Sequence, residues 1–248
     1  MSVVYKINII LFVLLLSINA FSQQDNEKII TNQVWVDYYQ HTYFKLKWEY
    51  YGDAGYRFLA NDFSWHMIHF RPSIRYIASD FWEALGGIGF FQTFNKDNTN
   101  TFEIRPWQGA RIKWPSYKSF LFSHFIRLEE RIILPKGYAA EFNMRFRYRL
   151  NLNINIYKSN KDDLLFIPIY AEWFLDAGQK IHEIFSNRSR YAIGLGYRIP
   201  KDWIFEFYFV RQNSKLMDDE EFGTVDHLYQ FKIRRNLFKI ESREQEKH

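Results

Sequence analysis

The sequence predicts an all-β fold, a closed antiparallel transmembrane β-barrel of ten strands, with twelve strands as the alternative. Three observations predict it. Beyond residue 30 the hydrophobicity alternates with a period of two, the alternating segments are mostly ten residues or longer, and turn-forming residues separate them. A soluble β-sandwich also alternates, but its strands are usually about 5 to 6 residues long. The length of the alternating segments therefore favours a membrane barrel.

Residues 1–22 have the pattern of a secretory signal peptide. Lys6 precedes an apolar run from Ile7 to Ile18, and the small residues Ala20 and Ser22 have the spacing that a signal peptidase requires. The run is too short for a transmembrane helix, which needs about 20 apolar residues. We therefore expect cleavage after Ser22 and a location in the outer membrane of a Gram-negative bacterium. Residues 23–31 are expected to be an N-terminal periplasmic segment, and 239–248 a charged periplasmic tail.

The clearest strand runs from Glu141 to Ile154. Side chains that follow each other along a strand point to opposite faces of the sheet. One face of this segment is entirely apolar or aromatic, and the other carries only polar and charged groups, three of which are Arg145, Arg147 and Arg149. Such a segment can place one face against lipid and the other in a polar lumen.

The same alternation predicts ten strands within a barrel domain of residues 32–238. They are Phe44–Arg57, Trp65–Ile77, Phe81–Phe94, Phe102–Trp114, Leu121–Ile132, Glu141–Ile154, Leu164–Leu175, Arg188–Ile199, Trp203–Asn213 and Asp226–Asn236. An additional apolar and aromatic piece, Asn32–Tyr39, is either a further strand or the start of the first one. Longer connections follow the third, fifth, seventh and ninth strands, which predicts that both ends of a ten-stranded barrel lie on the periplasmic side.

The composition excludes several kinds of site. With no Cys among 248 residues, the chain has no disulfide, no Cys-ligated metal and no Cys nucleophile. A net charge of +5 is modest, and we expect no nucleic-acid partner. No cofactor and no metal site are expected, because His66 and His69 are three residues apart and so lie on opposite faces of a strand, and Asp218 to Glu221 is best explained as a solvated loop.

Several short motifs resemble an uncharacterised family, domain of unknown function 2490. They are Arg71-Pro72, Arg105-Pro106-Trp107-Gln108, Arg127-x-Glu129-x-Arg131, Arg145-x-Arg147-x-Arg149, Glu172, and Asn187-Arg188 followed by Gly194-Leu195-Gly196-Tyr197. The resemblance extends from about Trp35 to Phe238. It implies an outer-membrane β-barrel of the kind common in Bacteroidota, and it carries no catalytic assignment. We expect outer-membrane lipids and lipopolysaccharide as partners of such a barrel.

Charged residues on the polar faces of neighbouring strands are expected to form a charge network in the lumen. The network comprises Arg71, Arg75, Arg105, Arg127, Glu129, Arg131, Glu141, Arg145, Arg147, Arg149, Glu172, Arg188 and Glu206. Arg suits such a site because its planar guanidinium can hold a carboxylate through two hydrogen bonds. Two interpretations stay open, a structural plug of ion pairs and a cationic lumen that handles small anionic solutes.

An outer-membrane lipid hydrolase is the alternative function. It would need a nucleophile and a base on the same face, and Ser123-His124 cannot supply both because adjacent residues of a strand point to opposite faces. A cross-strand partner for His124 would be required. We therefore expect no catalytic residues from this pair itself.

Overall fold

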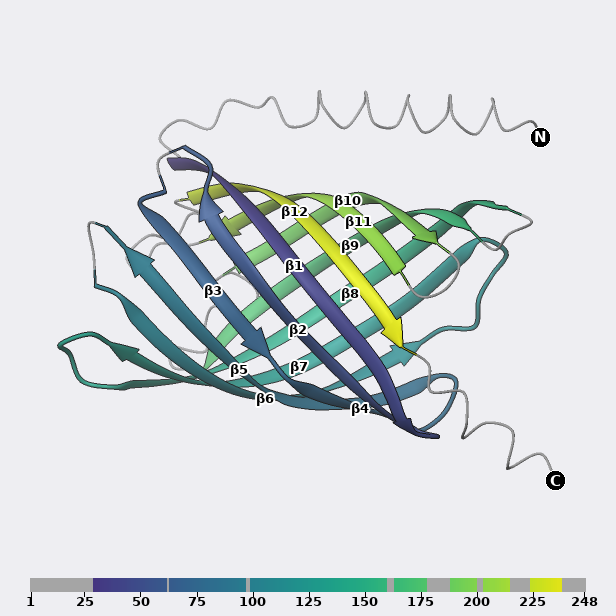
Figure 1. The fold of residues 1–248 in the computed structure, drawn as a ribbon, viewed down its shortest axis with the longest axis horizontal. Helices are drawn as coiled ribbons and strands as arrows, with labels where there is room; N and C mark the ends of the chain where they lie inside the picture. Colours follow the sequence, from purple (N-terminus) through teal and green to yellow (C-terminus); the bar gives the residue numbers. More distant parts are fainter. Residues whose placement is uncertain are drawn as a thin grey trace.

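The computed structural model describes residues 29–61, 63–96, 99–159, 163–177, 188–199, 203–214 and 224–237. Within this part of the chain all regular structure is β, and the strands form one closed barrel (Figure 1). The predicted all-β barrel is confirmed. The predicted signal peptide, the acidic run 218–221 and the tail 239–248 lie outside the described residues, as do residues 23–28.

Twelve strands make up the barrel wall. They are β1 (Ile29–Lys45), β2 (Trp48–Leu59), β3 (Trp65–Arg71), β4 (Ser73–Ile77), β5 (Trp82–Asn95), β6 (Thr101–Lys113), β7 (Phe120–Pro135), β8 (Glu141–Lys158), β9 (Leu164–Ala177), β10 (Arg188–Ile199), β11 (Trp203–Ser214) and β12 (Thr224–Leu237). From β2 to β11 each strand pairs antiparallel with its neighbours in the wall, and β12 pairs antiparallel with β11. The wall begins at Ile29, three residues before the predicted boundary.

β3 and β4 share one position in the wall. Both pair with β2 on one side and with β5 on the other, and Pro72 separates them. Proline has no N–H for the ladder, which explains the break in the strand predicted over Trp65–Ile77. The described wall therefore has twelve strands at eleven positions, and the predicted count of ten is wrong.

The additional position belongs to β1. It pairs antiparallel with β2 and parallel with β12, in a register that runs from Ile29↔Thr224 to Thr42↔Leu237. The piece Asn32–Tyr39 is thus part of an independent strand. The strand predicted over Phe44–Arg57 is wrong, because a two-residue turn at Leu46 and Lys47 divides it between β1 and β2.

The two ends of the barrel differ in the lengths of their connections. We call one the short-turn end, with connections 46–47, 78–81, 114–119, 159–163 and 200–202, and the other the long-loop end, with connections 60–64, 96–100, 136–140, 178–187 and 215–223. β1 begins at the long-loop end, and β12 finishes at the short-turn end (Figure 1). The expectation that both ends of the wall lie together is wrong, since an odd number of positions places them apart.

Alternation along each strand gives the wall an apolar outside and a mostly polar inside. In β11, Glu206 is buried in the lumen while Phe205 and Phe207 face outward and are exposed. In β8, Arg145 and Arg147 are buried inside, and Phe142 and Phe146 are exposed outside. No helix among the described residues is long and apolar enough to cross a membrane.

The interior has two sides of different chemistry. Strands β1 and β9 to β12 contribute an apolar cluster, which comprises Trp35, Tyr170, Ala192, Tyr208, Val210 and Leu228. The remaining strands contribute mainly Arg, Glu and Asp side chains. Gly55 lies where these parts meet, and a Cβ built on it would stand 2.3 Å from Asp37 Oδ1 and 2.5 Å from His69 Cε1. Only glycine fits at this position without displacing the two side chains.

Candidate functional site in the barrel lumen

Glu129 of β7 is the centre of the largest ion-pair cluster. Its carboxylate accepts hydrogen bonds from Arg145 Nη2 at 2.5 Å and Arg147 Nη1 at 2.6 Å. Arg127 Nη1 lies 3.4 Å away, and Arg105 Nη1 lies 3.8 Å away. The antiparallel register explains the convergence, because Arg145 is directly opposite Glu129 and Arg147 is directly opposite Arg127.

Glu172 of β9 continues this cluster. It accepts hydrogen bonds from Arg147 Nη2 at 2.6 Å and from Arg149 Nη2 at 3.0 Å, and Arg190 Nη1 lies 3.4 Å away. Arg147 therefore bridges two buried carboxylates. A guanidinium can do this because its donors form a planar fork, whereas a lysine ammonium is a single point charge.

A second cluster joins β2, β4, β5 and β6. Glu83 lies 2.7 Å from Lys113 Nζ, 3.0 Å from Arg111 Nη1 and 3.4 Å from Arg75 Nη1. Arg75 also forms an ion pair with Glu49. Arg111 Nη2 donates to Tyr51 Oη at 3.3 Å, a contact that crosses the lumen from β6 to β2.

Three smaller groups complete the ionic interior. Glu103 accepts from Arg105 Nε at 2.8 Å and Arg131 Nε at 2.7 Å. Asp53 accepts from Arg71 Nε at 2.9 Å and lies 3.1 Å from His69 Nε2. Glu206 forms an ion pair with Arg234 Nη2 at 3.1 Å.

The residues predicted for the charge network differ in their contacts and in their exposure. The structure places the following in ion pairs inside the barrel: Arg71, Arg75, Arg105, Arg127, Glu129, Arg131, Arg145, Arg147, Arg149, Glu172 and Glu206. Arg188 instead donates from Nε to Ser214 Oγ at 3.2 Å. Glu141, the first residue of β8, is on the same face of the strand as Arg145 and is exposed at the rim of the wall, away from the buried ion pairs.

The prediction also missed several charged residues of the interior, which are Asp37, Asp53, Glu83, Arg111, Lys113, Arg190, Lys232 and Arg234. Each lies on the inward face of its strand. The alternation of its own strand could have identified it, since each has apolar or aromatic neighbours in the sequence that point outward.

Several inward-facing side chains have almost no exposure to solvent. Ten described residues are at most 2% exposed, and two of them, Glu49 and Glu83, belong to the cluster around Arg75. The other eight, which we call the solvent-excluded layer, are Asp37, His69, Phe91, Glu129, Glu172, Phe174, Val210 and Leu228. Some contacts in this region reach across the interior, as where the Arg190 guanidinium of β10 lies 5.0 Å from the ring centroid of Trp35 in β1. We infer that side chains close the barrel at this level, as is common in narrow barrels.

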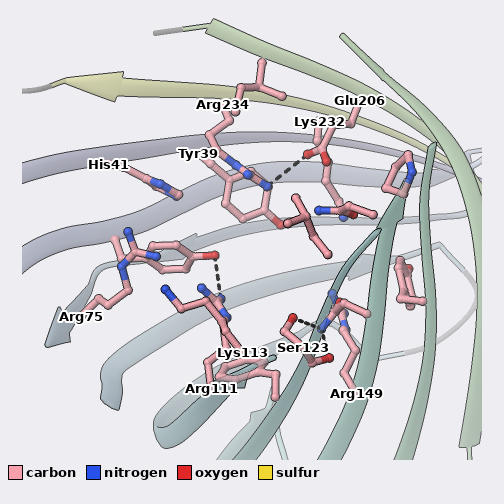
Figure 2. Close-up of a pocket in the computed structure, with 18 of the residues that line it drawn as sticks. Tyr39, His41, Arg75, Arg111, Lys113, Ser123, Arg149, Glu206, Lys232 and Arg234 are labelled. Carbon is pink, nitrogen blue, oxygen red and sulfur yellow. Dashed lines mark hydrogen bonds and ion pairs between the residues drawn. The ribbon is translucent and has the colours of Figure 1, made fainter. Parts of the chain in front are cut away.

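Between this layer and the short-turn end lies a chamber of about 560 Å³ (Figure 2). Ten basic side chains and three acidic ones line it within the described part of the wall. The basic ones are Arg71, Arg75, Arg111, Lys113, Arg127, Arg147, Arg149, Arg198, Lys232 and Arg234, and the acidic ones are Glu49, Asp53 and Glu206. Figure 2 shows Arg75, Arg111 and Lys113 on one side of this space, and Lys232 and Arg234 on another.

The carboxylates that pair with cations of the chamber are more covered than those cations. The side chains of Glu49, Glu83 and Glu172 are only 2–3% exposed. Among their partners, Arg111 is 19% exposed, Arg149 is 24% exposed and Lys113 is 37% exposed. A solute in the chamber therefore meets positive charge first, even though many of these cations are paired.

The candidate pairs of residues considered from the sequence are not assembled into other sites. The Ser123 side chain faces the lumen, where it is 3.5 Å from Asn151 Nδ2, and His124 Nδ1 is 2.7 Å from Tyr148 Oη on the outer face. His66 stacks on Phe94, whereas His69 contacts Asp37 and Asp53. No group of three or more potential metal ligands of the His, Cys, Asp or Glu type occurs among the described residues.

Comparisons with known proteins identify a family and no activity. Among solved structures, the beta domain of the Bordetella autotransporter Brka matches with 10% sequence identity and a TM-score of 0.43, over 66% of this chain and 76% of that chain. The curated proteins gave no significant match. The family model described as Protein of unknown function (DUF2490) matches residues 32–222. The chain therefore belongs to the DUF2490 family.

Proposed function

We propose that this protein is an outer-membrane β-barrel that binds small anionic solutes in a cationic, blind-ended chamber. The single observation that carries the proposal is the arrangement of charge in the chamber wall, where carboxylates are covered and their Arg and Lys partners stay accessible. Cations held in place by such pairs are already ordered, so an anion binds them without first ordering flexible side chains.

The outer surface supports insertion in a membrane. Large apolar side chains are exposed around the whole circumference, for example Ile68, Phe70, Ile88, Leu195 and Phe231. An apolar surface of this extent is unfavourable in water and favourable in lipid. The closed wall satisfies the backbone hydrogen bonds between strands, as a bilayer requires. We assign the long-loop end to the cell exterior and the short-turn end to the periplasm, following the usual arrangement in such barrels.

The solvent-excluded layer supports binding rather than conduction. A pore needs a continuous water path, whereas Glu129, Glu172 and Phe174 are almost inaccessible in the middle of the lumen. Opening a path would separate buried ion pairs, which costs several kcal/mol for each partner removed. The chamber is thus a compartment with access from the short-turn end.

Binding of an anionic dye to the folded protein in detergent tests the proposal. A trisulfonated pyrene is small enough for a cavity of about 560 Å³, and its fluorescence anisotropy reports binding. We expect binding that weakens at least fivefold on Lys113→Glu, because Lys113 is an accessible cation of the chamber. The control Lys136→Glu changes the net charge equally but lies in the turn 136–140 at the opposite end, and we expect no effect.

Two results would contradict the proposal. One is absence of dye binding by the unchanged protein, and the other is an equal loss of binding in both variants, which would indicate attraction by net charge alone. Planar bilayers provide a separate check on the solvent-excluded layer. Purified protein is expected to give no steady conductance, and an anion-selective current would show that the lumen is open.

A further inference from the structure

Lys232 of β12 is a buried cation of the chamber without a carboxylate partner among the described residues. It is 7% exposed, and no ion pair within 4.0 Å joins it to another residue of the described ranges. Its contacts are with aromatic rings, since Nζ lies 4.0 Å from the ring centroid of Tyr208 and 5.6 Å from that of Tyr170. Burial of a charge that has only such contacts is unfavourable.

The acidic residue opposite Lys232 in the β1–β12 register is Asp37, which accepts a hydrogen bond from Gln230 Nε2 at 2.5 Å and lies 3.5 Å from His69 Nε2. The acidic residue on the other side of Lys232 is engaged as well. Glu206 stands directly opposite Lys232 in the β11–β12 register. Its carboxylate accepts a hydrogen bond from Tyr208 Oη at 3.0 Å and another from Arg234 Nη2 at 3.1 Å. Lys232 Nζ instead lies over the Tyr208 ring. Lys232 lines the chamber, near Arg234 and Glu206 (Figure 2).

A second cation approaches the same ring from another strand. The Arg149 guanidinium of β8 lies 4.3 Å from the ring centroid of Tyr170, so Tyr170 of β9 has Arg149 and Lys232 nearby. Both cations line the chamber. Glu172 neutralises part of the charge of Arg149, but its carboxylate is shared with Arg147 and Arg190 as well. Across the chamber wall, ten basic side chains stand against three acidic ones, so the cations that line this space outnumber the acids that line it.

We propose that Lys232, Arg149 and the two tyrosines Tyr170 and Tyr208 form a subsite for a phosphate group. This inference rests on the proposed function and adds the chemical class of the solute. A phosphate group carries about 1.5 to 2 negative charges near neutral pH and has several strong acceptor oxygens. It can therefore neutralise Lys232 and accept from Arg149 Nη1, since Arg149 Nε and Nη2 already donate to Glu172. A carboxylate has one charge and would leave the excess partly uncompensated. The remaining volume and the tyrosine rings leave room for an organic part such as a sugar.

Isothermal titration calorimetry of the folded barrel in detergent tests the subsite. The probes are inorganic phosphate, glucose 6-phosphate and glucose. We expect binding of one or both phosphate probes and none of glucose. Lys232→Met is expected to weaken phosphate binding at least tenfold, and Lys232→Arg to restore it to within about threefold because the charge returns. The matched control Lys136→Met, in a turn at the opposite end, is expected to leave binding unchanged.

The comparison of the three probes also distinguishes the source of the phosphate group. Tighter binding of glucose 6-phosphate than of inorganic phosphate would assign the site to a phosphomonoester, and the reverse to free phosphate. Unchanged phosphate binding by Lys232→Met would overturn the subsite while leaving anion binding in the chamber intact. Failure of the unchanged protein to bind both phosphate and the sulfonated dye would overturn the proposed function as well. Binding of the dye without phosphate would overturn only the present inference.

A measurement on the unchanged protein keeps the inference testable if Lys232→Met does not fold. Lys232 lines the chamber although it is only 7% exposed, so reductive methylation is continued until a measurable fraction of Lys232 is modified in the absence of phosphate. Mass spectrometry quantifies the modification of each lysine. Phosphate is expected to lower modification of Lys232 at least fivefold, while glucose leaves it unchanged and Lys136 is modified equally throughout. Equal modification of Lys232 with and without phosphate would contradict the subsite.

Discussion

At the scale of single residues, the interior depends on close contacts that tolerate little change. Gly55→Ala is expected to destabilise the barrel by about 1–3 kcal/mol, because the added methyl would overlap with Asp37 Oδ1 and His69 Cε1. Gly86→Ala is the matched control, since its nearest heavy atom would be Trp107 O at 3.6 Å, an ordinary contact. The temperature at which the folded band disappears on gels measures both. Equal loss in the two variants would point to a general intolerance of alanine in the strands.

The buried ion pairs lead to a second prediction for a single residue. Glu172→Gln removes the carboxylate that Arg147, Arg149 and Arg190 share. The change should cost about 3–5 kcal/mol, because three cations inside the barrel, of which Arg147 and Arg190 are buried, then lack it. Glu141→Gln, on the exposed rim of the same sheet, should change stability by less than about 0.5 kcal/mol. Unfolding in urea with lipid vesicles provides the comparison, and similar midpoints for both variants would contradict the role given to Glu172.

At the scale of strands, the seam between β1 and β12 is the feature that most needs a direct test. Val36 and Phe231 are partners in the parallel register, and both side chains are exposed on the outer face. Because the chain has no Cys, the double variant Val36→Cys, Phe231→Cys should form an intramolecular disulfide on mild oxidation. The control pair Val36→Cys, His227→Cys is offset by four residues and should remain reduced. Cross-linking of the control pair alone would show that the register is different.

Individual strands also illustrate how much of the fold and of the lumen site can be predicted from the sequence. β8 was predicted well because polar and apolar residues alternate without interruption from Glu141 to Ile154. β1 was missed as a complete strand because its turn to β2, Leu46-Lys47, contains none of the Gly, Pro, Asn or Asp residues that usually mark a turn. Alternation gives the face of Glu129 but not its partners, since those depend on register and on contacts across the lumen. For the same reason the sequence does not reveal that Lys232 has no carboxylate partner among the described residues.

At the scale of the whole molecule, the proposed orientation can be tested with single cysteines. Ile30 lies at the long-loop end and Leu46 at the short-turn end, and both are exposed. A membrane-impermeant maleimide applied to intact cells should label Ile30→Cys and leave Leu46→Cys unlabelled, because only the long-loop end faces outward. Permeabilised cells should give labelling of both. The opposite pattern on intact cells would reverse the orientation and place the mouth of the chamber on the cell surface.

The odd number of wall positions also limits how this chain can be rearranged. In a barrel with an even number, the first and last strands run in opposite directions, and a short peptide can join the old ends in a circular permutant. Here β1 and β12 run in the same direction, so Ile29 and Leu237 are separated by the height of the wall. A permutant of this barrel would need a linker that traverses the bilayer or the lumen, and new ends are tolerated only if such a segment is supplied.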